Sequence, residues 1–107
     1  MPKIIVSYCL RPQVSQVEYE KYFREEKHSR VTSFPSVISF KLNRVTSILE
    51  GEKSADYIGV LEIISLEAYE KDRETEKFQN FLAKWINFAE PSTIRVFCTE
   101  EVNTKIP

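Results

Sequence analysis

His28 and Glu62 are the two residues of this sequence best suited to acid–base chemistry. His28 is the only histidine, and imidazole has an ordinary pKa of about 6.5, which allows proton transfer near neutral pH. Glu62 lies within an apolar stretch, where desolvation raises the pKa of a carboxyl group and makes it a candidate proton donor or base. Each also has a structural interpretation: His28 as a surface or capping residue, and Glu62 as the ion-pair partner of Lys41 or Arg44.

Other polar residues offer binding groups rather than reactive ones. Tyr8 and Asn43 fall on expected strands and can hold a carbonyl or hydroxyl group by hydrogen bonds, although either can be purely structural. One histidine and scattered acids supply too few ligands for a metal site, so we expect no metal. Cys9 and Cys98 fit neither a disulfide framework nor a metal motif, and only two glycines are present, too few for a phosphate loop.

Length and composition indicate one ordinary globular domain over residues 1–107. The apolar fraction is 42%, the charged fraction is 29% and the net charge is −1, with no basic patch, which argues against nucleic acid as a partner. No apolar stretch reaches the roughly 18 residues of a membrane span, and no signal-peptide pattern occurs. We therefore expect a cytoplasmic protein without a membrane partner, in which both cysteines stay reduced.

Four strands are expected from β-branched and aromatic runs. The first and third are apolar on both faces, which is typical of central strands, and the second alternates polar and apolar residues as an edge strand does. On that second strand Ile38, Phe40 and Leu42 should share one face. The four ranges are 3–10, 37–49, 57–64 and 93–102.

Two helical regions separate these strands. Ser15 and Glu18 have capping-box spacing and should open a helix that runs to about residue 31. Its buried stripe is Tyr19, Tyr22 and Phe23, whereas residues such as Glu20 should be solvated. A short helix over 66–73 and a longer one from 75 follow. The large residues of the longer helix indicate core rather than cofactor contacts: Phe78, Phe81, Leu82, Trp85, Phe88 and Ala89.

The helical position of His28 conflicts with a catalytic role. At about 100° per residue, His28 lies half a turn from Tyr19 and points away from the aromatic stripe. A bulge or unwinding near residues 26–29 would turn it toward the core, and such bulges are common at functional sites.

The order β-α-β-β-α-β is that of the ferredoxin-like split βαβ unit. We therefore predict an α+β fold with a four-stranded antiparallel sheet and helices on one face. The other face carries too many apolar residues to remain in water, so a second copy of the chain should cover it. That arrangement is a homodimeric α/β barrel.

The segment from Tyr22 to Phe40 is similar to an EthD-like pattern of the dimeric α/β-barrel superfamily. In that pattern an aromatic pair precedes a histidine, a proline and an aromatic-rich strand, here Tyr22-Phe23, His28, Pro35 and residues 40–45. Residues 59–69 resemble the third strand and following helix. The spacing from Phe23 to His28 is one residue longer than the pattern often has, so carrying over a catalytic role requires a helical bulge.

By overall similarity the chain resembles the RedY/HapK-like branch, which is associated with prodiginine pigment pathways. The resemblance implies a cofactor-free protein of secondary (antibiotic-type) metabolism on the bipyrrole arm of such a pathway. It would bind a pyrrolic or aromatic intermediate in a pocket between sheet and helices and promote cyclisation or dehydration. His28 and Glu62 would be catalytic, with substrate bound by Tyr8, Tyr22, Asn43 and Trp85.

Haem degradation and non-catalytic binding are the two alternative functions. The haem-degrading monooxygenases of the superfamily use Asn, Trp and His in that chain order, whereas here the order is His28, Asn43 and Trp85. We therefore reject haem degradation. A non-catalytic binding protein or chaperone for a pathway intermediate or a partner enzyme stays open, because an aromatic pocket serves a carrier as well as an enzyme.

Overall fold

Four strands form one antiparallel sheet in the order β2-β3-β1-β4. The computed structural model describes residues 1–105. The strands are β1 (Lys3–Tyr8), β2 (Val37–Arg44), β3 (Tyr57–Ile63) and β4 (Arg95–Thr99). The edge position of β2 and the central positions of β1 and β3 confirm the assignment made from their apolar patterns, and with it the α+β ferredoxin-like arrangement.

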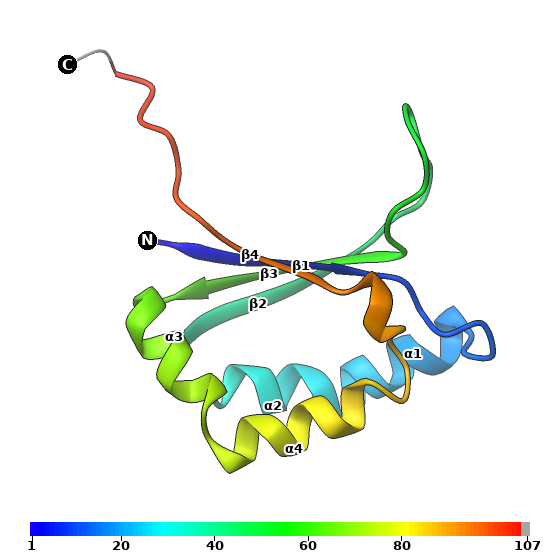
Figure 1. Cartoon of the computed structure of the whole chain (residues 1–107), viewed down its shortest axis with the longest axis horizontal. Coiled ribbons are helices and arrows are strands. Elements are labelled where there is room, and N and C mark those ends of the chain that lie inside the picture. The colour runs from blue at the N-terminus through cyan, green and yellow to red at the C-terminus, as the bar shows by residue number, and fades with distance from the viewer. Residues whose placement is uncertain (106–107) are drawn as a thin grey trace.

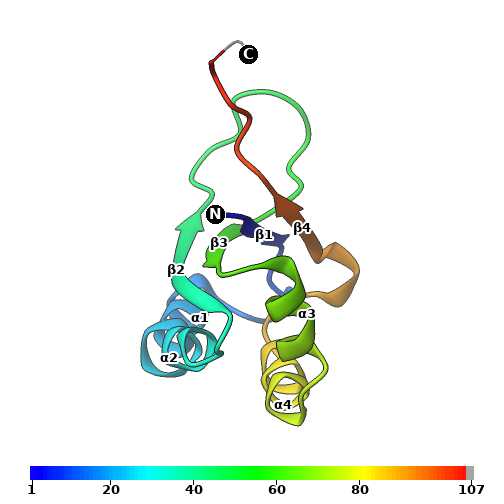
Figure 2. The same ribbon diagram turned by 90° about the vertical axis from the view of Figure 1, so that its left-hand side faces the viewer.

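All helices lie on one face of the sheet (Figure 1). Seen from the end, α1 and α2 form one row beneath the sheet and α3 and α4 form a second (Figure 2). The side chains of Ser15, Ser65 and Thr75 each accept an N–H of the following turn, which confirms the expected helix starts. The helical segments are α1 (Gln16–Tyr22), a π-helix η1 (Phe23–Lys27), α2 (His28–Thr32), α3 (Leu66–Arg73), α4 (Glu76–Trp85) and a 3₁₀ turn η2 (Pro91–Thr93).

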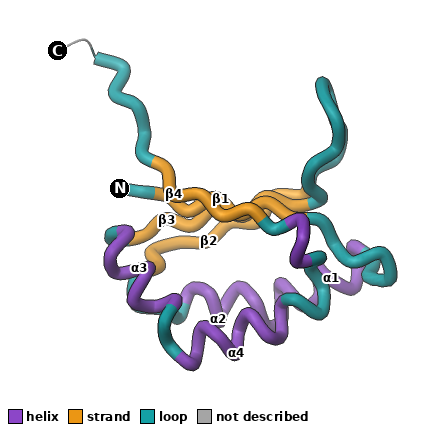
Figure 3. Tube along the Cα trace, in the orientation of Figure 1, coloured by secondary structure: helices purple, strands orange, loops and turns teal. Residues whose placement is uncertain are grey.

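The strands are shorter than expected, and β2 and β4 differ most from the expectation. β2 ends at Arg44, and residues 45–56 rise as a connection on the side of the sheet opposite the helices, as does the segment after β4 (Figure 3). β4 begins two residues late because Pro91 starts a 3₁₀ turn, and it ends at Thr99. A β-bulge between Val37 and Ser39 leaves Ile38 47% exposed, so Ile38 does not share the buried face of Phe40.

The two cysteines lie near different ends of a strand pair. β1 and β4 are neighbours, but Cys98 is paired with Ile4 whereas Cys9 follows the last residue of β1. Both are free thiols. No helix in residues 1–105 is long and apolar enough to cross a membrane.

The face of the sheet without helices carries an apolar row across three strands. Ile5 of β1 is in register with Val60 of β3 on one side and with Phe97 of β4 on the other. Phe97 is 53% exposed. Since the side chains of a strand alternate between faces, these three residues lie opposite the buried helix-facing residues Ile4 and Leu61.

We expect a second copy of the chain to cover this apolar row and to bury more than about 1,000 Å² in total. The chain should sediment as a dimer at micromolar concentration. Phe97→Asp should shift it to a monomer, because a carboxylate in an apolar interface is costly to desolvate. Val17→Asp is the matched control, since Val17 is 79% exposed on α1 and lies on the helical side. A parental chain that sediments as a monomer would contradict the expectation.

Candidate active site

A cavity of about 370 Å³ lies between the sheet and the helices. Its walls are mainly apolar, and no aspartate or glutamate lines it. The polar and charged residues of its lining are Tyr8, Lys27, Tyr69 and Arg73. The apolar lining comes from the sheet (Val6, Val37, Phe40, Gly59, Leu61 and Val96) and from the helical segments and the residues that follow them (Val31, Phe34, Phe78, Phe81, Leu82, Trp85, Ile86, Pro91 and Ile94).

Two of the six residues predicted for the site, Tyr8 and Trp85, line this cavity. Tyr22 is buried but packs elsewhere: its ring stacks on Phe88 at 4.2 Å between centroids. Burial, followed by the negative charge of Glu26, raises the pKa of Tyr22 to about 12. The Tyr22 hydroxyl is therefore a neutral structural group at neutral pH.

The remaining three predicted residues lie outside the cavity. Asn43 is exposed, and its amide donates to the carbonyl of Ile58 at 3.4 Å. Glu62 is on the opposite face of the sheet, in register with Lys3 and Ser39. Its alternative partner Arg44 pairs with Glu20 instead.

His28 is exposed at the start of α2. Its ring stacks on that of Phe40 at 6.0 Å and meets the ring of Phe23 edge-on at 5.7 Å. Phe40 borders the cavity and His28 does not. The sheet separates His28 from Glu62, so the predicted catalytic pair is not brought together, and a role for either residue stays a prediction.

The helical bulge required by the long Phe23–His28 spacing is present, as the π-helix over residues 23–27. The backbone N–H of His28 bonds to the carbonyl of Phe23, five residues back. The residue turned inward by this segment is Lys27, which is only 4% exposed. Lys27 follows Tyr19 and Phe23 at intervals of four, about 80° from Tyr19 on a regular helix. That spacing is the feature of the sequence that indicates an inward-facing residue at position 27, and it was not used in selecting His28 and Glu62.

Lys27 belongs to a buried group of four hydrogen-bonded side chains, Tyr8, Tyr19, Lys27 and Trp85, here called the lysine cluster. Lys27 Nζ lies 2.7 Å from Tyr19 Oη and 3.2 Å from Tyr8 Oη. Trp85 Nε1 donates to Tyr19 Oη at 3.0 Å, and the two tyrosine hydroxyls also bond to each other. The cluster joins β1, α1, η1 and α4, and it reaches the cavity through three of its members.

Burial lowers the pKa of Lys27 well below its ordinary value. No carboxylate in residues 1–105 forms an ion pair with it. Lys27 Nζ lies 4.5 Å from the ring centroid of Trp85 and 4.9 Å from that of Tyr8. The cation–π interaction with these rings would offset part of the free energy of desolvating a charged Lys27. Burial also raises the pKa of Tyr8 and Tyr19, so both phenols are neutral.

Counting protons in the lysine cluster supports an uncharged Lys27. Trp85 can only donate, each hydroxyl has one proton and two lone pairs, and a neutral amine has two protons and one lone pair. In that state, donors and acceptors are equal in number. An ammonium group would add a proton and remove a lone pair, and no acceptor outside the cluster bonds to it within residues 1–105. Two donors would then lack an acceptor in the cluster, the Tyr8 hydroxyl and one N–H of Lys27, and both residues border the cavity.

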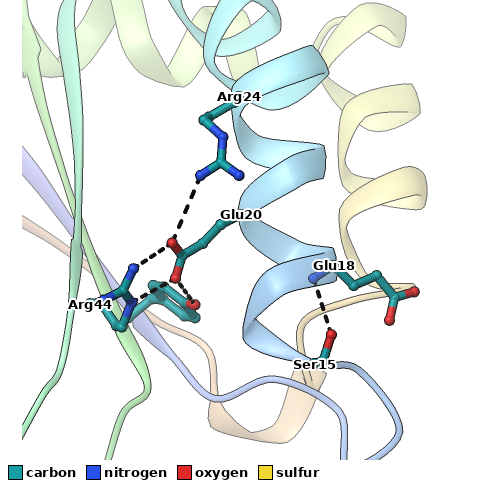
Figure 4. A network of polar contacts seen from close by, with 6 residues as sticks. Ser15, Glu18, Glu20, Arg24 and Arg44 are labelled. Atoms are coloured by element: carbon teal, nitrogen blue, oxygen red, sulfur yellow. Dashed lines mark hydrogen bonds and ion pairs between the residues drawn. The ribbon is translucent and has the colours of Figure 1, made fainter.

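A second polar group supports the lysine cluster from outside (Figure 4). Arg44 donates two hydrogen bonds to the carboxylate of Glu20, at 2.6 and 2.7 Å. Tyr57 donates a third at 2.7 Å. These bonds, with that of Arg44 the strongest, lower the pKa of Glu20 to about 2. Glu20 is thus a fixed anion rather than the freely solvated residue expected, and it holds Tyr57 against the rings of Tyr8 and Tyr19.

The lowered pKa of Lys27 predicts a pH dependence of stability. Between the folded-state pKa and the ordinary value of 10.5, the unfolded chain binds a proton that the folded chain does not. The free energy of unfolding should therefore rise with pH across that window, by at most about 1.4 kcal/mol per pH unit. The raised pKa values of the tyrosines oppose this trend only above about pH 10.

Urea unfolding of the parental chain and of Lys27→Met from about pH 7 to about pH 9.5 measures the effect. As the pH rises, the free energy of unfolding of the parental chain should increase relative to that of Lys27→Met. Lys71→Met, at an exposed lysine, should follow the parental curve. Parallel curves for the parental chain and Lys27→Met would show that Lys27 keeps its ordinary pKa.

The comparisons with known proteins agree with this architecture. Residues 2–102 match the family model described as REDY-like protein HapK. No protein of curated function matches the sequence. Among solved structures, HapK from Hahella chejuensis is 20% identical over 100% of this chain and 98% of its own, with a TM-score of 0.77.

Two further structures share the fold at lower identity. An EthD-family protein from Bacillus halodurans is 17% identical over 95% of this chain and 99% of its own, with a TM-score of 0.74. SnoaB from Streptomyces nogalater, described as a cofactor-independent oxygenase, is 12% identical over 96% and 94%, with a TM-score of 0.70. The family match spans nearly the whole chain, and the chain belongs to the REDY-like HapK family.

Proposed function

We propose that this protein acts in secondary metabolism, in a prodiginine-like pigment pathway, on a pyrrolic or aromatic intermediate of the bipyrrole arm. It binds that intermediate in the cavity between sheet and helices and promotes cyclisation or dehydration by general acid/base catalysis. Membership of the REDY-like HapK family supports the pathway class. The observation that carries the chemistry is a buried lysine at a mainly apolar cavity, with no carboxylate partner within residues 1–105.

The cavity suits a flat apolar ligand. Aromatic rings of Phe34, Phe78, Phe81 and Trp85 line it from the helical side. Such rings bind planar ligands by stacking and edge contacts. The polar groups are few, as in most small-molecule sites, where a small number of them fixes the orientation of the ligand.

Lys27 and Tyr8 supply the acid–base pair of this mechanism. The uncharged amine of Lys27 takes a proton from a carbon or nitrogen of the ligand. The resulting ammonium group donates to the Tyr8 oxygen, so the Tyr8 proton is free to point into the cavity. There the Tyr8 hydroxyl protonates a developing oxyanion or a leaving hydroxyl group. Tyr19 and Trp85 orient this pair by their hydrogen bonds. No metal or cofactor enters the scheme, in keeping with the chemistry named for SnoaB, a protein of the same fold.

The geometry favours Lys27 and Tyr8 over His28 and Glu62 as the proton-transfer residues. His28 is separated from the cavity by Phe40, and Glu62 faces the other side of the sheet. A non-catalytic carrier in the cytoplasm remains the second candidate, because the apolar walls alone would bind an intermediate. The two functions differ in whether the buried amine takes part in a reaction.

Kemp elimination of 5-nitrobenzisoxazole tests the acid–base proposal without the natural substrate. In this reaction a base removes the ring C–H proton, the N–O bond breaks, and a coloured 2-cyano-4-nitrophenolate is released. The substrate is flat and apolar, as the cavity requires. The parental chain should accelerate it, and Lys27→Met should lower the rate by about 10²- to 10⁴-fold.

Matched variants separate the candidates. His28→Ala should keep the parental rate, whereas Tyr8→Phe should lower turnover and leave binding intact. Binding is followed by the fluorescence of Trp85, the only tryptophan, which lines the cavity. Parental rates in Lys27→Met, with substrate still bound, would refute the acid–base assignment and favour the carrier. A loss in His28→Ala alone would return the role to His28.

A further inference from the structure

We propose that Lys27 is also a nucleophile that forms an imine with flat aromatic aldehydes entering the cavity. The inference rests on the proposed function only in that it uses the same ligand cavity. It adds a covalent step and a substrate class, aromatic and heteroaromatic carbaldehydes.

The first argument is the state of the amine. A lysine reacts with a carbonyl group only when it is unprotonated, and desolvation in an apolar pocket is a common way to achieve that near neutral pH. Lys27 is 4% exposed and has no ion-pair partner in residues 1–105, and the proton count of the lysine cluster matches a neutral amine. An ordinary lysine with a pKa of about 10.4 is unprotonated in only about one molecule in 10³ at pH 7.4.

The second argument is the proton supply around the amine. Imine formation needs a group that protonates the carbonyl oxygen and accepts a proton from nitrogen. The Tyr8 hydroxyl lies 3.2 Å from Nζ and lines the cavity. Tyr19 backs both groups and keeps them in place through its bond to Trp85. Because burial raises the pKa of Tyr8, the hydroxyl gives and receives protons together rather than passing through a free phenolate.

The reaction is balanced within the site. Nζ attacks the aldehyde carbon, and as the C–N bond forms the carbonyl oxygen takes the Tyr8 proton while Tyr8 receives one from nitrogen, giving a carbinolamine. Tyr8 then protonates the carbinolamine hydroxyl, the C–O bond breaks, and water leaves. The nitrogen lone pair forms the C=N bond, and the remaining proton on nitrogen returns to Tyr8. No oxidant or reductant is involved.

The third argument is the environment of the product. The cavity walls are mainly aromatic and aliphatic, no carboxylate lines them, and such walls offer few groups that could hold water near the imine carbon. Exclusion of water slows hydrolysis of a reactive intermediate. The planar aldehyde group of an aromatic ring extends the plane of the ring, which fits between the sheet and the rings of α4.

Reductive trapping tests the inference. The full chain is incubated at pH 7.4 with 2-naphthaldehyde and sodium cyanoborohydride, and the modified lysines are located by peptide mass mapping. Lys27 should be labelled at least about tenfold faster than exposed Lys71, because burial favours the unprotonated amine, whereas only about one part in 10³ of an ordinary lysine is unprotonated at this pH. If Lys27 is buried but unreactive, Lys71 should be labelled faster than Lys27.

Three comparisons sharpen the result. Tyr8→Phe should slow labelling of Lys27 by about 10²-fold or more and leave Lys71 unchanged. An excess of 2-methylnaphthalene, which has the ring but no aldehyde, should protect Lys27 alone. Lys27→Arg should abolish the fast phase, with folding checked by circular dichroism. Labelling confined to exposed lysines, with Lys27 unmodified, would overturn the inference.

Failure of the inference differs from failure of the proposed function. If Lys27 stays unlabelled but 2-methylnaphthalene binds and Kemp elimination depends on Lys27, only imine formation is refuted. If neither binding nor Kemp elimination is found, the proposed function fails as well. If Lys27 is labelled rapidly while Kemp elimination does not depend on it, imine formation stands and the acid–base assignment falls.

Discussion

The buried amine of Lys27, which has no counter-ion within residues 1–105, is the constraint on which this structure depends. Desolvating an ion costs several kcal/mol, so the surroundings of Lys27 must either neutralise it or provide acceptors. Two phenol oxygens and the faces of aromatic rings are what the fold provides. Tyr8, Tyr19 and Trp85 come from three different elements, so the sheet and both helical rows must be in place before the amine is satisfied.

The π-helix is the local device that places this amine. A regular helix repeats every 3.6 residues and would keep Tyr19, Phe23 and Lys27 on a drifting stripe, whereas one wider turn at residues 23–27 realigns it. The fixed anion Glu20, one turn earlier on α1, holds Tyr57 against the phenols of the cluster. The irregular turn thus lies between two regular helical segments, α1 and α2, and such turns are frequent at functional sites.

Apolar periodicity was enough to predict the fold, because a two-residue period in strands and a 3.6-residue period in helices follow from burial on one face. The cavity positions of Tyr8 and Trp85 were expected from the family resemblance, whereas periodicity alone assigned Trp85 to the helix core. It could not find Lys27, since lysine is rarely buried and a charged residue on a helix is normally assigned to solvent. Nor could it place His28, whose direction depends on one wider turn, or the bulge that exposes Ile38.

The closed hydrogen-bonding of the lysine cluster limits the reactions that it can support. Within residues 1–105, none of its members donates to or accepts from a side chain outside the cluster, and Tyr57 contacts Tyr8 and Tyr19 only through its ring. A proton taken up by Lys27 therefore has no path of hydrogen-bonded side chains to Glu20 within residues 1–105. In the proposed mechanism it returns to the ligand through Tyr8. Such a site would suit reactions in which a proton leaves one atom of the ligand and arrives at another, as in the proposed cyclisation or dehydration.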